Sequence, residues 1–151
     1  MQISKLTCKN EIFDKILDWY YEWWGKGEGW SKEKVEYFLL HSINNDRLPV
    51  TYYAHEGDDI KGVYQISMFD LDVRPDIYPW LINIYVDEKS RGEGICRKLV
   101  FHAEKTAREM GYDELFLYTH HKGLYEKFGY KFFDNTETFR GDTETILKID
   151  L

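Results

Sequence analysis

The fold is decided by two neighbouring stretches, Trp80-Leu81-Ile82-Asn83-Ile84-Tyr85-Val86 and Arg91-Gly92-Glu93-Gly94-Ile95-Cys96. The first stretch is nearly continuously apolar, as expected of a central strand that is covered on both faces. From Gly94 to Met110 apolar residues recur at helical spacing, and Gly111 is suited to end that helix. The sequence therefore predicts a buried strand, a glycine turn and a helix in immediate succession.

The glycine turn is suited to binding an anion. A strand, a turn and a helix in this order direct free backbone N–H groups and the positive end of the helix macrodipole to one point. Gly92 and Gly94 allow the positive φ angles that a phosphate-binding nest requires, and Arg91 adds a positive charge. An ordinary strand-to-helix turn without a ligand uses glycine in the same way, so both interpretations stay open at this point. The spacing lacks the Walker and Rossmann patterns, which favours a pyrophosphate ligand other than ATP or NAD.

The remainder of the chain alternates helices and strands without a repeat, a low-complexity tract or a linker, which predicts a single domain over residues 1–151. The segment Glu56-Gly57-Asp58-Asp59 is typical of a hairpin turn between antiparallel strands. The elements expected from pattern and caps are strands at 1–6, 49–54, 61–69, 80–86, 115–119, 130–133 and 143–149, and helices at 10–24, 31–44, 94–110 and 124–128.

Composition and charge narrow the class of protein. The chain is 43% hydrophobic and 31% charged, which is typical of a globular domain, and its two cysteines lack the company that a zinc site or a disulfide framework needs. A net charge of −7 argues against nonspecific binding to nucleic acid or to an anionic membrane. Without a signal sequence or a long apolar run, we expect a cytoplasmic protein with no metal, no nucleic-acid partner and no membrane partner.

Two motifs resemble those of a known family. The segment from Tyr85 to Cys96 is similar to the coenzyme A motif of the GNAT N-acetyltransferases, written [RQ]-x-x-G-x-[GA], with Arg91, Gly94 and Cys96 at its defined positions. Downstream, the runs 115–119 and 124–130 resemble the fifth strand and the tyrosine-bearing fourth helix of that family. The runs 69–76 and 79–80 resemble a bacterial GNAT subgroup whose substrates are mostly unassigned.

The resemblance implies an α/β fold of the α+β kind, with a mixed, mostly antiparallel sheet of six to seven strands, about four flanking helices, and splayed fourth and fifth strands. It implies acetyl-CoA as cosubstrate and Tyr125 as the acid that protonates the departing thiolate; the other interpretation of Tyr125 is a core aromatic. The cofactor-binding residues that it implies are Ile84, Tyr85, Val86, Arg91, Gly92, Glu93, Gly94, Ile95 and Cys96.

The chain departs from the family pattern at Glu93 and Cys96, where many members carry a basic or neutral residue and a glycine or alanine. It also lacks the carboxylate that some members place on the fourth strand as a general base. A water chain that ends at one of several polar residues is the alternative, and these residues are Asp70, Asp72, His120 and His121. We favour His120 as the catalytic base, because it follows the fifth strand where that strand should separate from the fourth.

The acceptor half of the site is less defined. Four tryptophans lie in or near the segment between the first two helices, and with nearby carboxylates they would suit an amine with an apolar body. Trp19 and Trp23 are also spaced as an i, i+4 core pair, so that interpretation stays open. The residues expected to contact the substrate are Trp23, Trp30, Asp70, Asp72 and Trp80.

These observations predict an acetyl-CoA-dependent N-acetyltransferase in which an amine, either a small molecule or a peptide N-terminus, attacks the thioester directly. The alternatives are a protein lysine acetyltransferase, a noncatalytic acyl-CoA-binding sensor module, and a structural domain that binds no coenzyme A. The protein is expected to be a monomer or a homodimer.

Overall fold

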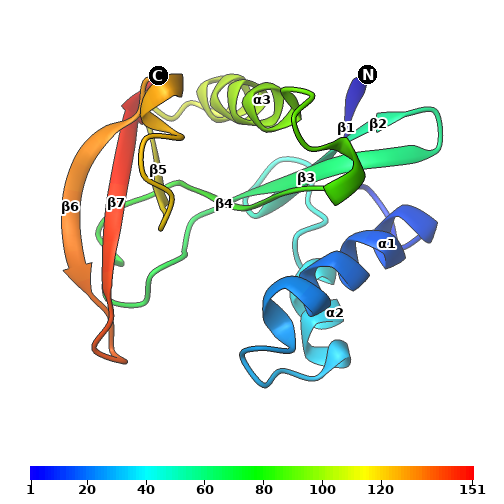
Figure 1. Cartoon of the computed structure of the whole chain (residues 1–151), viewed down its shortest axis with the longest axis horizontal. Helices are drawn as coiled ribbons and strands as arrows, with labels where there is room; N and C mark the ends of the chain where they lie inside the picture. Colours follow the sequence, from blue (N-terminus) through cyan, green and yellow to red (C-terminus); the bar gives the residue numbers. More distant parts are fainter. The chain divides into compact units, whose positions relative to one another are not determined.

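A computed structural model describes residues 1–151 and contains a seven-stranded sheet with three α-helices (Figure 1). The strand order is β1-β2-β3-β4-β5-β7-β6. The elements are β1 (Gln2–Lys5), α1 (Glu11–Tyr20), η1 (Tyr21–Gly25), α2 (Lys32–Leu40), β2 (Val50–Glu56), β3 (Asp59–Ser67), β4 (Trp80–Val86), η2 (Glu88–Ser90), α3 (Ile95–Glu109), β5 (Glu114–Tyr118), η3 (Glu126–Phe128), β6 (Lys131–Glu137) and β7 (Thr143–Asp150).

The central strands β4 and β5 run parallel and pair at Trp80 and Phe116. The pairs β1–β2, β5–β7 and β6–β7 are antiparallel. The mixed, mostly antiparallel sheet with splayed fourth and fifth strands that the sequence predicted is therefore confirmed. None of the helices is both long enough and apolar enough to cross a membrane.

Several elements differ in extent from the sequence prediction; for example, the helix expected at 31–44 ends at Leu40. The first helix is α-helical only to Tyr20 and then widens into the π-helical turn η1, in which the N–H of Lys26 donates to Tyr21 O at 2.8 Å. The short helix expected at 124–128 is the single 3-10 turn η3, because Gly129 adopts a left-handed φ of 98° and ends it. Strand β6 continues to Glu137, beyond the predicted 130–133.

The chain divides into two compact units. Unit 1 comprises residues 1–65 and 83–99, and unit 2 comprises residues 66–82 and 100–151. Strand β4 and helix α3 each contribute residues to both units.

The core of unit 1 lies between α1, α2 and the strands β1 to β3, and Figure 1 shows both helices on one face of these strands. Helix α1 starts where the side chain of Asn10 accepts a hydrogen bond from the N–H of Phe13 at 3.0 Å. Its apolar stripe then falls on one face and is buried. The buried side chains of this core are Leu6, Phe13, Ile16, Leu17, Tyr20, Val35, Leu39, Ile60 and Val63.

The core of unit 2 is built around Trp80, which has no exposed surface and donates its indole N–H to Ile77 O at 2.9 Å. Leu71, Ile77, Ile82, Phe116 and Ile146 complete this cluster. Strand β5 is buried from Leu115 to Leu117, whereas the first five residues of β6, at one end of the strand order, are exposed. The burial of β5 explains why its sequence is apolar without alternation.

Gly62 on β3 provides a test of the packing in unit 1. A Cβ atom at this position would lie 2.8 Å from Tyr85 O and 3.0 Å from a methyl carbon of Leu99. Because one of these neighbours is backbone, we expect Gly62→Ala to lower the free energy of unfolding by about 2 kcal/mol, as overpacking does. Urea unfolding measures this loss. The matched control is Gly27→Ala, whose Cβ would have its nearest neighbour at 3.8 Å. Equal stability of the two variants would contradict the close approach.

Candidate active site

The glycine turn has the backbone geometry that an anion site requires. After the 3-10 turn η2, Arg91 is extended, and Gly92 and Gly94 have φ angles of +84° and +76°. Helix α3 then begins at Ile95, whose side chain is buried, while residues 91–94 are exposed. The N–H groups of the first turn of any α-helix have no partner within that helix, so those of α3 face the exposed turn.

Arg91 connects this turn to the end of β4 through a hydrogen bond and a contact with an aromatic ring. Its Nε donates to Val86 O at 3.2 Å, and its guanidinium carbon lies 5.7 Å from the ring centroid of Tyr85. Glu93 is exposed. Burial raises the pKa of the half-buried Cys96 thiol, which keeps it protonated and poorly nucleophilic.

Tyr85 is also the partner of two tryptophans. Its ring centroid lies 5.1 Å from that of Trp19 and 5.5 Å from that of Trp23. Trp19 packs against the core of unit 1, whereas Trp23 in the π-helical turn keeps 48% of its surface exposed. Trp30 is 45% exposed and has Lys34 Nζ 5.8 Å from its ring. The two tryptophans of the predicted i, i+4 pair thus differ: one packs on the core and one presents a face to solvent.

Strand β4 carries a local distortion at Asn83, which has a φ of +51° although it is not glycine. Such a residue is strained unless its surroundings hold it. Asn83 Nδ2 donates to Gln65 Oε1 at 2.7 Å, and Tyr20 Oη donates to Asn83 O at 3.3 Å. Gln65 Nε2 in turn donates to Thr51 Oγ1 at 2.9 Å. These hydrogen bonds hold the distortion next to Ile84 and Val86, which the sequence predicts to line the coenzyme.

Tyr125 lies at the start of η3 and is 8% exposed. Its ring makes edge contacts with Phe128 and Tyr130 at centroid distances of 6.2 and 6.1 Å. Burial, together with the charges of Glu104 and Tyr125, raises the pKa of Tyr130 well above its usual range. Tyr125 is thus a buried phenol with aromatic neighbours on two sides.

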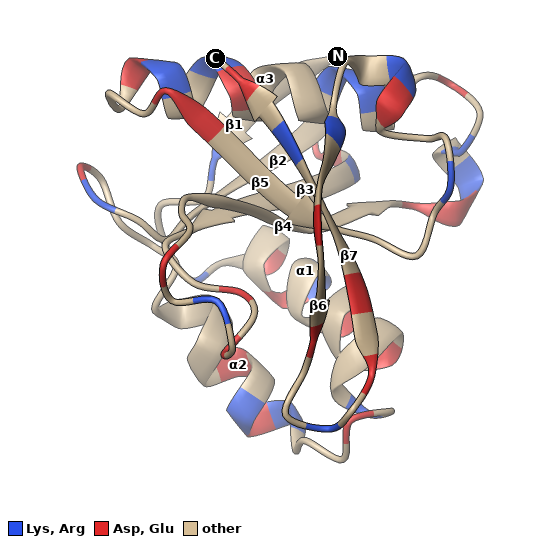
Figure 2. Ribbon diagram, turned by 90° about the vertical axis from the view of Figure 1, so that its left-hand side faces the viewer, with Lys and Arg blue, Asp and Glu red and all other residues tan.

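His120 makes a short contact with a glutamate that the sequence did not predict. Its Nε2 lies 2.6 Å from Glu144 Oε2, and the side chain of His120 is 80% exposed whereas that of Glu144 is 11% exposed. Glu144 lies on β7, and Figure 2 shows that acidic segments recur along β6 and β7. Glu144 escaped prediction because a glutamate in an alternating strand has no motif; only its inward position, two residues before the buried Ile146, marks it.

Asp70 is the second acidic residue of this part of unit 2. Burial raises its pKa from 3.8 to about 7, and the nearby charges of Glu144 and Asp72 add to this shift. Asp72 is exposed. Trp80, which was expected to contact substrate, instead lies in the core of unit 2 with no exposed surface. The structure therefore brings Asp70 into the electrostatic reach of Glu144 and leaves Trp80 no face for a ligand.

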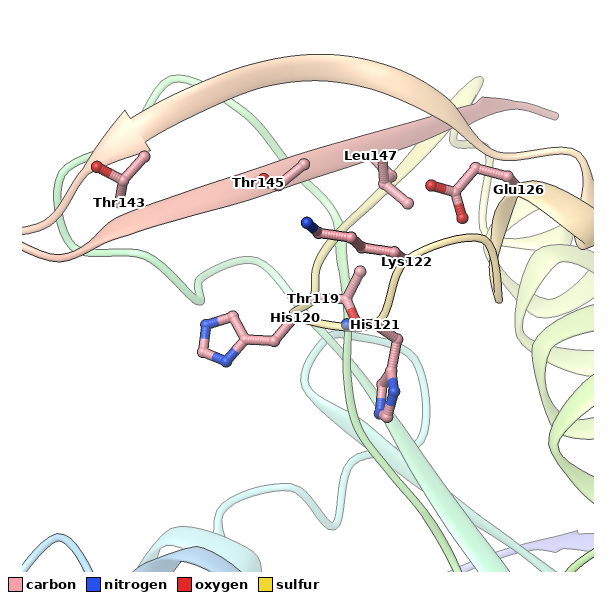
Figure 3. Close-up of a pocket in the computed structure, with 8 residues that line it drawn as sticks. All are labelled: Thr119, His120, His121, Lys122, Glu126, Thr143, Thr145 and Leu147. Carbon is pink, nitrogen blue, oxygen red and sulfur yellow. The ribbon is translucent and has the colours of Figure 1, made fainter.

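A cavity of about 370 Å³ lies in unit 2 between the turn after β5 and strand β7. Figure 3 shows the side chain of Lys122 directed toward Thr143 and Thr145, while the imidazoles of His120 and His121 point away from Lys122. Its lining residues are Thr119, His120, His121, Lys122, Glu126, Thr143, Thr145 and Leu147. No group of three or more His, Cys, Asp and Glu side chains is arranged to hold a metal ion.

Comparison with known proteins assigns the family. The family model described as "Acetyltransferase (GNAT) family" matches residues 13–130, which include the glycine turn and Tyr125. The chain therefore belongs to the GNAT acetyltransferase family. A search of the curated proteins finds no significant match.

Solved structures share the fold over nearly the whole chain. An aminoglycoside 6'-N-acetyltransferase complexed with coenzyme A has a TM-score of 0.78 at 17% identity, with 99% of this chain and 97% of that chain covered. The aminoglycoside 6'-N-acetyltransferase from Enterococcus faecium has a TM-score of 0.73 at 18% identity, with the same coverage of 99% and 97%. A GNAT family acetyltransferase from Elizabethkingia anophelis with acetyl-CoA bound has a TM-score of 0.70 at 21% identity, again covering 99% and 97%. At these identities the likeness establishes the fold.

The raised pKa of Asp70 predicts a specific pH dependence of stability. Because the folded chain holds a proton on Asp70 more tightly than the unfolded chain, the stability that this carboxyl contributes is fully present below pH 3.8 and is lost as the pH rises through about 7. The asparagine side chain of Asp70→Asn is neutral at every pH, so this variant lacks the loss of stability that the carboxyl causes. Since Asp70 keeps part of its surface exposed, we expect the decline in unfolding free energy between about pH 4 and pH 8 to shrink by roughly 2 kcal/mol.

Chemical denaturation at several pH values measures this change. The control is Asp46→Asn, which alters an exposed carboxyl in unit 1. A decline as steep in Asp70→Asn as in the wild type would contradict the assignment.

Proposed function

We propose that the chain transfers an acetyl group from acetyl-CoA to an amine. The observation that carries this proposal is the turn from Arg91 to Cys96, in which two glycines adopt positive φ angles directly before α3, within the part of the chain that the acetyltransferase family model matches. The structural relatives with coenzyme A or acetyl-CoA bound support the choice of ligand.

In this proposal the backbone of the turn binds the pyrophosphate of the coenzyme. The N–H groups from Arg91 to Cys96 supply donors, and the positive end of α3 adds to the attraction for the anion. The backbone of Ile84, Tyr85 and Val86 on β4 pairs with the pantetheine arm, as the family resemblance implies. The distortion at Asn83 sets the direction of these backbone groups, so that an N–H can meet the thioester oxygen as it gains negative charge.

Tyr125 is proposed to protonate the departing thiolate. A phenol with an ordinary pKa of about 10 can supply a proton to a thiolate whose conjugate acid has a pKa of about 8.5 when the groups meet at close range. Tyr125 is 8% exposed, so its phenol lies in an environment from which most water is excluded.

The acceptor is proposed to be a small amine with an apolar or ring-rich body. Trp23 and Trp30 keep about half of their surface exposed and suit such a body, while Asp70 and Asp72 suit the amine charge. Two of the structural relatives are named as aminoglycoside acetyltransferases, which supports a small amine over a protein lysine. Acetylation of a peptide N-terminus remains the second form of the same proposal.

Two measurements test the proposal. Calorimetry with coenzyme A and acetyl-CoA should show binding, and a thiol-release assay with acetyl-CoA should identify acceptors among polyamines, aminoglycosides, amino acids and peptides with free N-termini. Binding without thiol release for any amine would favour the noncatalytic sensor. Failure of both measurements would reject the proposed function.

Gly94→Ala tests the coenzyme loop. A side chain at a φ of +76° is strained, so the turn relaxes and its N–H groups leave their alignment. We expect the Kd for coenzyme A in calorimetry to rise at least tenfold. Gly141→Ala is the matched control, because Gly141 has a similar φ of +88°, has equally open surroundings and lies in the turn after β6. Both variants should lose about 1 kcal/mol of stability, and only the first should lose affinity. Equal coenzyme affinities would remove the loop from the site.

Tyr125→Phe tests the acid. The variant keeps the ring contacts and loses the proton, so we expect kcat to fall about 100-fold while the affinity for acetyl-CoA stays within twofold. Thiol-release kinetics and calorimetry measure the two effects. Tyr37→Phe, which changes a tyrosine that is 67% exposed, is the control. An unchanged kcat in Tyr125→Phe would leave this residue only a packing role.

A further inference from the structure

The pair formed by His120 and Glu144 combines a buried carboxylate with an exposed imidazole. Glu144 lies on the inward face of β7 with Ile146, where a carboxylate is costly unless a partner satisfies it. Its partner His120 sits just beyond β5, and Thr119 N donates to Thr145 O at 3.3 Å to hold this segment beside β7. The 2.6 Å contact therefore joins two elements whose backbones are already fixed relative to each other.

The contact determines which ring nitrogen is available. If Glu144 is ionised, its oxygen accepts the Nε2–H of a neutral His120, and the unprotonated Nδ1 is then the atom that can take a further proton. Because the side chain of His120 is 80% exposed, an incoming molecule can reach this nitrogen. A histidine held this way by a carboxylate has the arrangement of a general base with its orienting group.

The charges around the pair favour a cation. Burial raises the pKa of Asp70, and the nearby charges of Glu144 and Asp72 add to this shift, while the neighbouring Arg74 is engaged with Asp76 and Asp134 at 2.9 Å. The cavity that His120 lines is also lined by His121, Lys122 and Glu126. Lys122 contributes a positive charge to it, and Glu126 contributes a negative charge. The carboxylates near Glu144 thus outnumber the free cations.

We propose that His120 is the proton acceptor for the attacking amine and that Glu144 is the positioning residue that holds its imidazole. This inference rests on the proposed acetyl transfer and deepens it, because it assigns the base that the family's fourth-strand carboxylate would otherwise supply. It also specifies the acceptor as a substrate that arrives as an ammonium ion.

The proton balance of the step is complete. The ammonium gives one proton to Nδ1 of His120, and the free amine attacks the thioester carbon, so that a C–N bond forms. The C–S bond breaks as the tetrahedral intermediate collapses, and the thiolate takes a proton from Tyr125. The nitrogen loses its second proton, which restores Tyr125 through solvent, and His120 releases its proton to water. The products are the amide, the free thiol of coenzyme A and one proton.

The test compares kcat/KM as a function of pH for four variants, His120→Gln, Glu144→Gln, His121→Gln and His41→Gln, with acetyl-CoA and the amine that gives the fastest thiol release in the acceptor screen. His120→Gln should lower kcat/KM about 100-fold near pH 7, and Glu144→Gln about tenfold. Since an amine of pKa about 10.4 loses its own proton as the pH rises, the deficit of His120→Gln should shrink as the pH increases toward 10. A purely structural loss would stay constant with pH. His41→Gln, which changes another exposed histidine, is the control.

A second readout does not depend on turnover. The imidazole Nε2–H of His120, held by Glu144, should give a downfield proton resonance that Glu144→Leu abolishes, because the ring is otherwise open to solvent exchange. Full activity of His120→Gln, a deficit that is constant with pH, or a deficit in His121→Gln as large as in His120→Gln would overturn the proposal. If coenzyme A binds and no amine is acetylated, the proposed function fails, and the resonance alone then decides whether Glu144 positions His120.

Discussion

The distortion of β4 at Asn83 is the constraint on which the proposed coenzyme-binding part of the site depends. A non-glycine residue with a φ of +51° costs free energy, and it persists here because the surrounding side chains leave it no alternative. Asn83 is bonded through its amide to Gln65, and Gln65 is bonded to Thr51, which meets Ser42 at 2.6 Å. The chain of polar contacts thus connects β4 to β3, β2 and the end of α2. Gln65, Thr51 and Ser42 are buried, so loss of one of them would leave its neighbour unsatisfied in the core.

The sequence of β4 is a nearly continuous apolar run, but its backbone is interrupted by the positive φ angle of Asn83. Trp80, Leu81 and Ile82 belong to unit 2, and residues from Asn83 onward belong to unit 1. The change of unit therefore coincides with the strained residue. In unit 2 the strand is anchored by the buried indole of Trp80, and in unit 1 Gly62 lets Tyr85 O approach β3 closely. The two halves of one strand are held by different cores, and Asn83 is the first residue of the half that belongs to unit 1.

Sequence reasoning predicted most of the fold and the backbone geometry of the glycine turn, because both have periodic or local signatures. The apolar run of β4, the glycines at 92 and 94 and the stripe of α3 each report one physical requirement that neighbouring residues must meet. It did not predict the π-helical turn after Tyr20, since the extra residue per turn leaves the helical spacing of the apolar side chains almost intact. It assigned Trp80 to the substrate, because a tryptophan at a strand start looks the same whether its ring faces a cleft or a core. Glu144 was missed for a further reason: its partner His120 is distant in sequence, and no local pattern links them.

Unit 2 largely buries carboxyl groups at positions where a core built for stability alone would have apolar side chains. Glu144 is nearly buried, and burial drives Asp70 toward its neutral form, with the nearby charges of Glu144 and Asp72 adding to this shift. A fold selected for stability alone would place apolar residues at both positions, because replacing buried charges by apolar groups is often neutral or stabilising. Asp70 holds a proton near neutral pH within the electrostatic reach of Glu144, and Glu144 contacts the exposed imidazole of His120. The stability given up at Asp70 is therefore the physical reason to seek the acid–base chemistry of this protein in unit 2.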